Sequence, residues 1–157
     1  MSDAIQIRLC TRDDCAEVLQ LWLDADATPS VTDTLDEVQR TVAEADAIVL
    51  VATDASGRIV GSVIGGWDGW RGNIYRLAVA PAARRHKVAA ALMREVSARL
   101  GSEKGARRIT ALVEKAHPDA VGFWNSMASQ GYAFDPRIVR FVRTIEPASA
   151  TSGDKKA

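Results

Sequence analysis

The stretch that decides the fold is LAVAPAARRHKVAAALM, residues 77–93, in which an apolar strand pattern passes through a proline into a helix. Pro81 ends the strand pattern because proline has no N–H to donate to a sheet. Apolar residues then recur every four positions from Val88 to Leu100 on an alanine-rich background, which predicts a helix over residues 88–100. The start of such a helix presents unpaired N–H groups and a positive dipole end. This junction is therefore a candidate phosphate site.

The sequence before this stretch predicts one strand, two helices and three further strands. Residues 5–9 alternate between apolar and polar side chains, as in a half-buried strand. Capping patterns precede helical spacing over residues 12–24 and again from residue 34. Two apolar runs joined by DASG, followed by NIYRLAVA, predict three consecutive strands within residues 47–80.

The sequence after this stretch predicts a strand over residues 109–113, a helix from His117 that stops at Gly131, and a last strand over residues 137–145. A strand, a helix and a second strand in this order form a right-handed crossover between parallel strands. The expected fold is α+β, a three-layer α/β/α arrangement around a mixed, mostly antiparallel sheet with one parallel strand pair. We expect one domain over residues 1–146 and a disordered tail over residues 147–157.

Composition narrows the classes of partner. Twenty basic and twenty acidic side chains in 157 residues leave no net charge that would favour nucleic acid or an anionic membrane. The N-terminus has no long apolar run behind basic residues, which predicts neither a signal peptide nor a membrane anchor and favours a cytoplasmic location. Cys10 and Cys15 lie in no cluster with zinc-ligand spacing, so we expect no metal and two buried free thiols.

The frame LAVAPAARRHKVAAALM resembles the acetyl-CoA-binding segment of the GNAT N-acetyltransferase superfamily. In that superfamily a strand with Leu-x-Val-x-Pro runs into Arg/Gln-x-x-Gly-x-Gly/Ala and a long helix, and the residues that match are Leu77, Val79, Pro81, Arg84, Val88, Ala89, Leu92 and Met93. WDGWRGNIYRLAV and AVGFWNSMASQGY resemble two further segments of bacterial members. The resemblance covers residues 5–145 and implies the GNAT fold, with two parallel strands that splay apart.

The resemblance also implies a reaction and a set of site residues. Pantetheine would lie between the splayed strands, a backbone N–H would hold the thioester oxygen, and an amine would attack acetyl-CoA directly in a ternary complex. The implied cofactor-binding residues are Leu77, Ala78, Val79, Arg84, Arg85, His86, Lys87, Val88, Ala89, His117 and Trp124. The implied acceptor is a small-molecule or peptide amine, and the protein would be a monomer or a homodimer.

Lys87 departs from the superfamily pattern because it occupies the glycine position. Glycine suits close approach of phosphate and an unusual backbone angle, which costs an L-residue roughly 1–2 kcal/mol. Lys87 must then point away from the pyrophosphate or crowd it, although its ammonium would also attract phosphate. The pattern leaves open whether cofactor binding is retained or impaired.

Three other positions differ from many relatives. Trp124 aligns with a tyrosine proposed to protonate the leaving thiolate, which an indole cannot do, so a buried packing role is the alternative. His117 aligns with an asparagine that contacts the cofactor, or it caps the following helix. Tyr75 stands where some relatives carry a carboxylate base; it is the candidate catalytic residue as an acid or orienting group, with packing as the alternative. Asp68 and Glu114 are further candidate bases.

The sequence gives little information about which molecule accepts the acetyl group. Acidic residues follow the first helix at Asp24, Asp26, Asp33 and Asp36, where they would attract a cationic amine or serve as solvated caps. Two other functions remain as alternatives: an acyl-CoA-binding or interaction module that has lost activity, and nucleic-acid binding through Arg84, Arg85, Lys87, Arg107 and Arg108. The absence of net charge argues against nucleic-acid binding.

Overall fold

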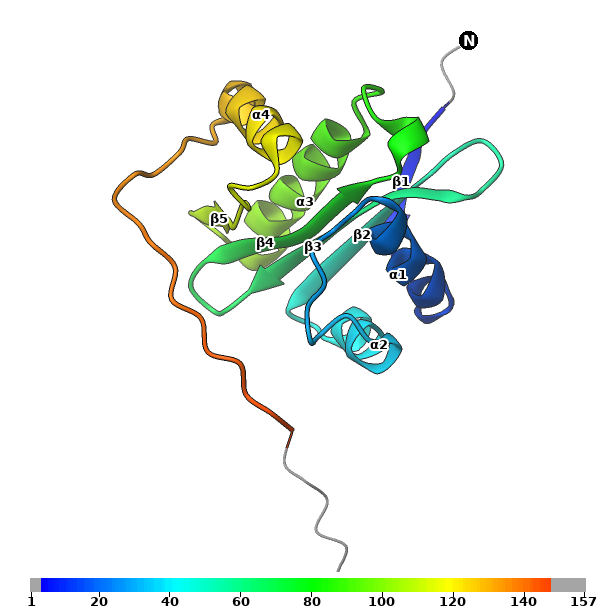
Figure 1. Ribbon diagram of the computed structural model, residues 1–157, viewed down its shortest axis with the longest axis horizontal. Coiled ribbons are helices and arrows are strands. Elements are labelled where there is room, and N and C mark those ends of the chain that lie inside the picture. The colour runs from blue at the N-terminus through cyan, green and yellow to red at the C-terminus, as the bar shows by residue number, and fades with distance from the viewer. Residues whose placement is uncertain (1–3, 148–157) are drawn as a thin grey trace, which may run out of the picture.

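The computed structural model describes residues 4–147 as a five-stranded sheet with helices on both faces (Figure 1). The strands follow one another in chain order: β1 Gln6–Leu9, β2 Ala47–Thr53, β3 Ile59–Trp67, β4 Gly72–Val79 and β5 Ile109–Ala111. The first three neighbouring pairs are antiparallel, and β4 and β5 are parallel. The predicted mixed, mostly antiparallel sheet is confirmed.

The helices begin at or close to the residues predicted for them, and the first two follow the predicted capping residues Thr11 and Thr34. They are α1 Cys15–Asp24, α2 Leu35–Ala43, α3 Val88–Lys104 and α4 Pro118–Ser126, with short 3-10 turns at Arg12–Asp14, Pro81–Ala83 and Met127–Gln130. Thr11 and Asp14 form a capping box ahead of α1. The hydroxyl of Thr34 accepts a hydrogen bond from the backbone N–H of Glu37 at the start of α2. These local signals are reliable because each one satisfies backbone groups at its own helix end.

The side chains of β2 divide the core into two layers. Ile48 and Leu50 belong to the cluster with α3, whereas Val49 and Val51 pack against α1 and α2. The alternation follows from the two-residue repeat of a strand, and it confirms the three-layer arrangement. Cys10 and Cys15 lie in the α1 layer as free thiols, as predicted.

Burial of Cys10 raises the pKa of its thiol to about 12, with a smaller contribution from the neighbouring Cys15. The thiol therefore stays protonated at neutral pH and packs as a small apolar group.

Helix α3 approaches β3 closely because β3 carries glycines at the contact. An added Cβ would lie 2.6 Å from Val96 Cγ2 at Gly65, and 2.9 Å from Val88 Cγ1 at Gly61. Both distances are shorter than real Cβ contacts, so these positions require glycine or a shift of the helix. The close contact holds the N-terminus of α3 next to the end of β4.

Strand β5 is shorter than predicted, since it ends at Ala111 rather than at residue 113. The reason lies in its neighbour: Arg76 in β4 has a φ of 52°, in the left-handed region, which interrupts the regular edge of β4. Leu112 and Val113 then have no ladder partner on β4, although their side chains suit a strand.

The strand predicted over residues 137–145 is wrong for this structure. These residues have extended or irregular backbone with no strand pairing, and their apolar side chains are exposed. Alternating composition predicts a strand, but a strand also requires a neighbouring edge with which to pair. Most of the expected disordered tail, residues 148–157, lies outside the described residues, and no helix within residues 4–147 is long and apolar enough to cross a membrane.

Candidate active site

The sheet opens between β4 and β5. The two strands pair only from Gly72 with Ile109 to Ile74 with Ala111, whereas β4 continues to Val79. On this edge, the backbone of β4 beyond Ile74 therefore has no ladder partner. Such an edge can hydrogen-bond to an extended group that carries amides. Leu77, Ala78 and Val79, predicted to bind pantetheine, lie along this opening.

Arg76 links the opening to the loop between α1 and α2. Its guanidinium lies 2.6 Å from both carboxylate oxygens of Asp33 and donates a 2.8 Å hydrogen bond to the carbonyl of Thr28. It also lies 5.2 Å from the centroid of the Trp22 ring. The Trp22 indole N–H in turn donates to the buried hydroxyl of Ser62, at 3.0 Å. Arg76 thus fixes one wall of the opening.

This role of Arg76 is not among the sequence predictions. The available signal was a single charged residue inside the apolar strand NIYRLAVA. The loop partner was not readable, because Asp33 is 43 residues away in sequence. Of the four acidic residues near the first helix, Asp33 is the one that lines the pocket at this opening, and its charge is paired with Arg76.

The junction before α3 has the backbone geometry of a glycine-containing turn without the glycine. Arg85 and Lys87 both have left-handed backbone, with φ of 66° and 63°. Lys87 is the N-cap of α3, since its carbonyl accepts from the N–H of Ala91 at 3.0 Å. The left-handed conformation costs an L-residue roughly 1–2 kcal/mol.

The side chains in this turn are exposed, and one of them already has a partner. The Arg84 guanidinium donates to the carbonyl of Ala25 at 3.1 Å, which ties the turn to the end of α1. His86 and Lys87 are exposed beside it, while Val88 is buried under the turn and Ala89 is half-buried. The first backbone N–H groups of α3 have no partner within the helix.

Helix α4 covers the other side of the opening. His117 is its N-cap residue through its backbone, but its imidazole makes no capping hydrogen bond. Its Nε2 lies 3.8 Å from the Glu114 carboxylate. Trp124 packs edge-on against Phe123 and Tyr132, with ring centroids 5.6 and 5.3 Å apart. Trp124 is half-buried, so it both packs in this aromatic cluster and leaves part of its ring accessible.

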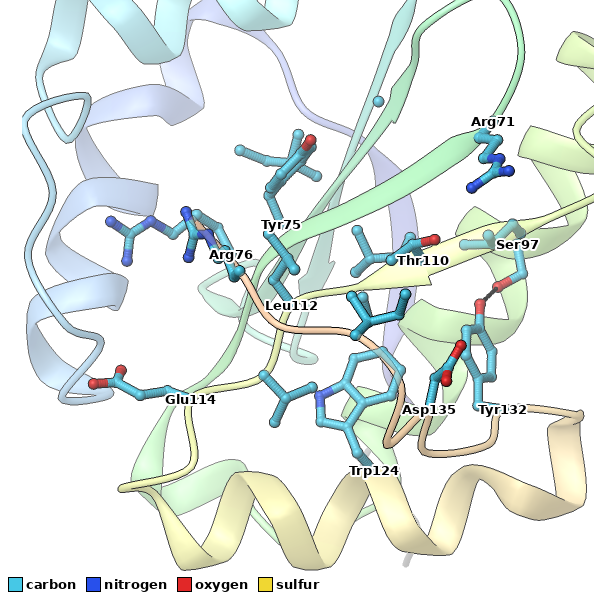
Figure 2. Close-up of a pocket in the computed structure, with 18 of the residues that line it drawn as sticks. Arg71, Tyr75, Arg76, Ser97, Thr110, Leu112, Glu114, Trp124, Tyr132 and Asp135 are labelled. Carbon is cyan, nitrogen blue, oxygen red and sulfur yellow. Dashed lines mark hydrogen bonds between the residues drawn. The ribbon is translucent and has the colours of Figure 1, made fainter. Parts of the chain in front are cut away.

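A large open pocket lies between the α1–α2 loop, β4, β5, α4 and residues 133–140 (Figure 2). Tyr75, Arg76, Glu114 and Trp124 line it. The Glu114 carboxylate accepts a 2.5 Å hydrogen bond from the hydroxyl of Thr28, which joins the segment after β5 to the α1–α2 loop.

On the opposite side of the pocket from Glu114, the Tyr132 hydroxyl and the Ser97 hydroxyl are 2.6 Å apart (Figure 2). Burial raises the pKa of Tyr132, so its phenol stays protonated at neutral pH.

The carboxylate of Asp68, a candidate base in the sequence, is hydrogen-bonded within its own turn. It accepts from the backbone N–H groups of Arg71 and Trp70 at 2.6 and 2.9 Å. These hydrogen bonds lower the pKa of Asp68, which makes it a weaker base. Of the two candidate bases, Asp68 and Glu114, it is Glu114 that lines the pocket.

Comparisons with known proteins show the family to which this chain belongs. Residues 13–128 match the family model described as Acetyltransferase (GNAT) family. An acetyltransferase of Yersinia pestis (strain Pestoides F) is 31% identical over 123 residues, which cover 78% of this chain and 86% of that protein.

Solved structures with the same fold are more distant in sequence. AAC(6')-Iy in complex with the bisubstrate analogue CoA-S-monomethyl-acetylneamine superimposes with a TM-score of 0.70 at 16% identity, over 90% of this chain and 99% of that chain. A ribosomal-protein-alanine N-acetyltransferase from Brucella melitensis biovar Abortus 2308 gives a TM-score of 0.66 at 19% identity, over 90% and 100%. The GNAT-like fold and the acyltransferase class predicted from the sequence are confirmed, and the chain belongs to the acetyltransferase (GNAT) family.

Proposed function

We propose that this protein is an N-acetyltransferase that transfers the acetyl group of acetyl-CoA to a primary amine by direct attack in a ternary complex. The observation that carries the proposal is the separation of β4 and β5 after Ile74, next to the left-handed turn that begins α3. A slot edged with backbone amides and a helix N-terminus together suit a pantetheine arm that ends in a pyrophosphate. The related structure with a CoA-containing bisubstrate analogue supports the same ligand class.

Different residues around the slot would bind different parts of acetyl-CoA. The main chain of Leu77, Ala78 and Val79 would pair with the pantetheine amides, and a backbone N–H there would stabilise the oxyanion of the attacked thioester. The N–H groups from Arg84 to Ala89 would bind the pyrophosphate, with Arg85, His86 and Lys87 exposed beside them. His117 and Trp124 would line the α4 side.

The acceptor amine must lose a proton before it attacks, since an amine of reference pKa about 10.4 is protonated at neutral pH. We assign the proton-accepting role to Glu114, because it is a carboxylate on the pocket wall with one hydrogen-bond donor, Thr28, and no arginine or lysine partner among the described residues. Tyr75 is 45% exposed in the same pocket, where it would orient the acceptor.

Calorimetric titration with acetyl-CoA, followed by a thiol-release assay, tests the proposal in two steps. We expect micromolar binding, and CoA release with at least one member of a panel of aminoglycosides, lysine-like amines and peptides with free N-termini. No binding would contradict the cofactor assignment. Binding without release across the panel would instead favour an acyl-CoA-binding module, above all if a Trp124→Tyr variant is equally inactive.

A further inference from the structure

The negative charge of the pocket is mostly compensated by the chain's own arginines. The acidic residues that line the pocket are Asp33, Glu37, Glu114 and Asp135. An arginine guanidinium lies 2.6 Å from Asp33, 3.5 Å from Glu37 and 2.9 Å from Asp135. Glu114 has no arginine or lysine partner among residues 4–147, and it is the residue to which we assign the proton-accepting role. The pocket therefore offers little free negative charge to an acceptor that carries several ammonium groups.

Two arginines of the pocket wall, Arg71 and Arg108, are less well compensated. Within the described range 4–147 the Arg71 guanidinium forms no ion pair; it lies 3.8 Å from the centroid of the exposed Trp70 ring. A cation–π contact of this kind orients the guanidinium without cancelling its charge. The carboxylate of Asp68 binds the backbone N–H of Arg71 instead. The side chain of Arg108 is 59% exposed and lies 3.9 Å from Asp135.

Strand alternation on β5 turns Arg108 toward the α1–α2 side of the sheet. Ile109 and Ala111 pack in the core cluster with α3. Successive side chains of a strand point to opposite faces, so the residues between and beside them face the other way. Arg108 therefore faces the side on which Thr28 of the α1–α2 loop holds Glu114.

The same alternation on β4 places Arg71 on this face. Gly72 and Ile74 face α3, since a Cβ added at Gly72 would lie 3.1 Å from Leu100 Cδ1 and Ile74 belongs to the core cluster with α3. Arg71 and Tyr75 therefore face the α1–α2 side. The backbone N–H of Gly72 donates to the carbonyl of Arg108 at 3.0 Å, so the two arginines occupy neighbouring positions on adjacent segments.

The pocket thus has a positive end and a catalytic end. Figure 2 shows Arg71 and Glu114 on opposite sides of the pocket, with Tyr75 between them. At about 3.3 Å per residue, the four residues from Tyr75 to Arg71 span roughly 13 Å. A single amino acid is too short for this span, because its amine and carboxylate are attached to one carbon. An extended peptide of about three or four residues has the required length.

We propose that the acceptor is the N-terminus of a peptide with an acidic side chain at its third or fourth residue, an inference that rests on the proposed function. The carboxylate of that side chain binds Arg71 and Arg108, while the amine lies near Tyr75 and Glu114. The nitrogen bonds to the acetyl carbon as the carbon–sulfur bond of acetyl-CoA breaks. Of the two protons that the ammonium loses, one passes through Glu114 to solvent and one goes to the CoA thiolate.

The test compares peptides that differ at one side chain. The probes are Ala-Gly-Gly-Glu-Gly, Ala-Gly-Gly-Gln-Gly and Ala-Gly-Gly-Lys-Gly, each amidated at the C-terminus, and thiol release gives kcat/KM for each. We expect kcat/KM for the glutamate peptide to exceed that for the glutamine peptide by about tenfold, the size of a charge-assisted contact to arginine. The lysine peptide should be the poorest acceptor of the three.

A charge reversal at the positive end separates recognition from a structural effect. Arg71→Glu should lower kcat/KM for the glutamate peptide at least about tenfold and raise it for the lysine peptide, because the new carboxylate repels one side chain and attracts the other. A merely structural role of Arg71 would lower both values together. Arg94→Glu is the control, since Arg94 is an exposed arginine of α3 that does not line the pocket, and it should leave the order of the peptides unchanged.

The outcomes separate this inference from the proposed function. Acetylation of all three peptides at equal rates, or better acetylation of the lysine peptide or of an aminoglycoside, overturns the inference and leaves the N-acetyltransferase activity standing. If no amine is acetylated, calorimetric titration of the CoA-bound protein with the same peptides decides. Tighter binding of the glutamate peptide, lost in Arg71→Glu, upholds the anion site, whereas equal binding or none overturns it.

Discussion

The two edges of β4 behave differently, and the contrast explains where the site forms. On one edge, β4 pairs with β3 from Gly72 with Trp67 to Val79 with Gly61, interrupted by one irregularity. On the other edge, it pairs with β5 for three residues only. Helix α3 packs closely behind β3, so the first edge is rigid. A ligand slot can therefore open on the second edge without loosening the sheet.

The first prediction concerns chemistry at the open edge. Glu114→Gln should lower kcat/KM for the acceptor about hundredfold, the usual size of a general-base contribution, while acetyl-CoA binding stays unchanged. The loss should be greatest near neutral pH and smaller in alkali, where the amine is already neutral. Glu103→Gln, which removes an exposed carboxylate on α3, is the control. Equal activity of Glu114→Gln and the parent at neutral pH would refute the role of Glu114.

Substitutions at the contact between β3 and α3 should change the stability of the protein rather than its catalytic activity. Gly65→Ala should lower the free energy of unfolding by about 2 kcal/mol, because the new Cβ would lie 2.6 Å from Val96 Cγ2. Gly101→Ala is the matched control: nothing lies within 4 Å of its added Cβ, and its place in α3 predicts a gain of up to about 1 kcal/mol. Denaturant titration of both variants measures the difference. Equal stability of the two would mean that α3 does not pack tightly on this edge.

Arg76 tests how the wall of the open edge is held. Arg76→Ala should raise KM for the acceptor about tenfold, since Asp33 and Thr28 lose their common donor and the α1–α2 loop loses its anchor. The dissociation constant of acetyl-CoA should change far less. Arg76→Lys should recover part of the loss, because lysine keeps the charge but not the two-pronged contact. Arg40→Ala, an exposed arginine of α2, controls for removal of a positive charge. Equal weakening of both substrates would indicate general unfolding instead of positioning.

The smallest predicted effect is at the left-handed turn before α3, which lies next to the open edge of β4. Lys87→Gly should raise the free energy of unfolding by about 1 kcal/mol, because glycine adopts a φ of 63° without steric cost. Thermal unfolding of the two forms measures this gain. Acetyl-CoA titration of the same pair then decides the question left open by the sequence. Tighter binding to the glycine form means that the lysine crowds phosphate, whereas weaker binding means that its ammonium contributes to the site.

Much of the fold could be read from local pattern. The capping residues Thr11 and Thr34, the apolar repeat of α3 and the proline after β4 each act within a few residues of themselves. Local signals of this kind keep their meaning when the chain folds, because they satisfy backbone groups of their own element. The segment 77–93 was informative for the same reason: its strand, turn and helix are adjacent in sequence.

What the sequence determined by itself is therefore the order of the elements as far as α4, their layers, and the strand, turn and helix of residues 77–93. Only the tertiary structure decided which side chains line the pocket: Arg76 pairs with Asp33 of the α1–α2 loop, the Asp68 carboxylate is hydrogen-bonded within its own turn, and β5 ends at Ala111. Only the tertiary structure left residues 137–145 without a strand partner. The physical reason is that contacts between distant segments, including strand pairing, depend on the geometry of both partners, and one segment of sequence specifies only one of them.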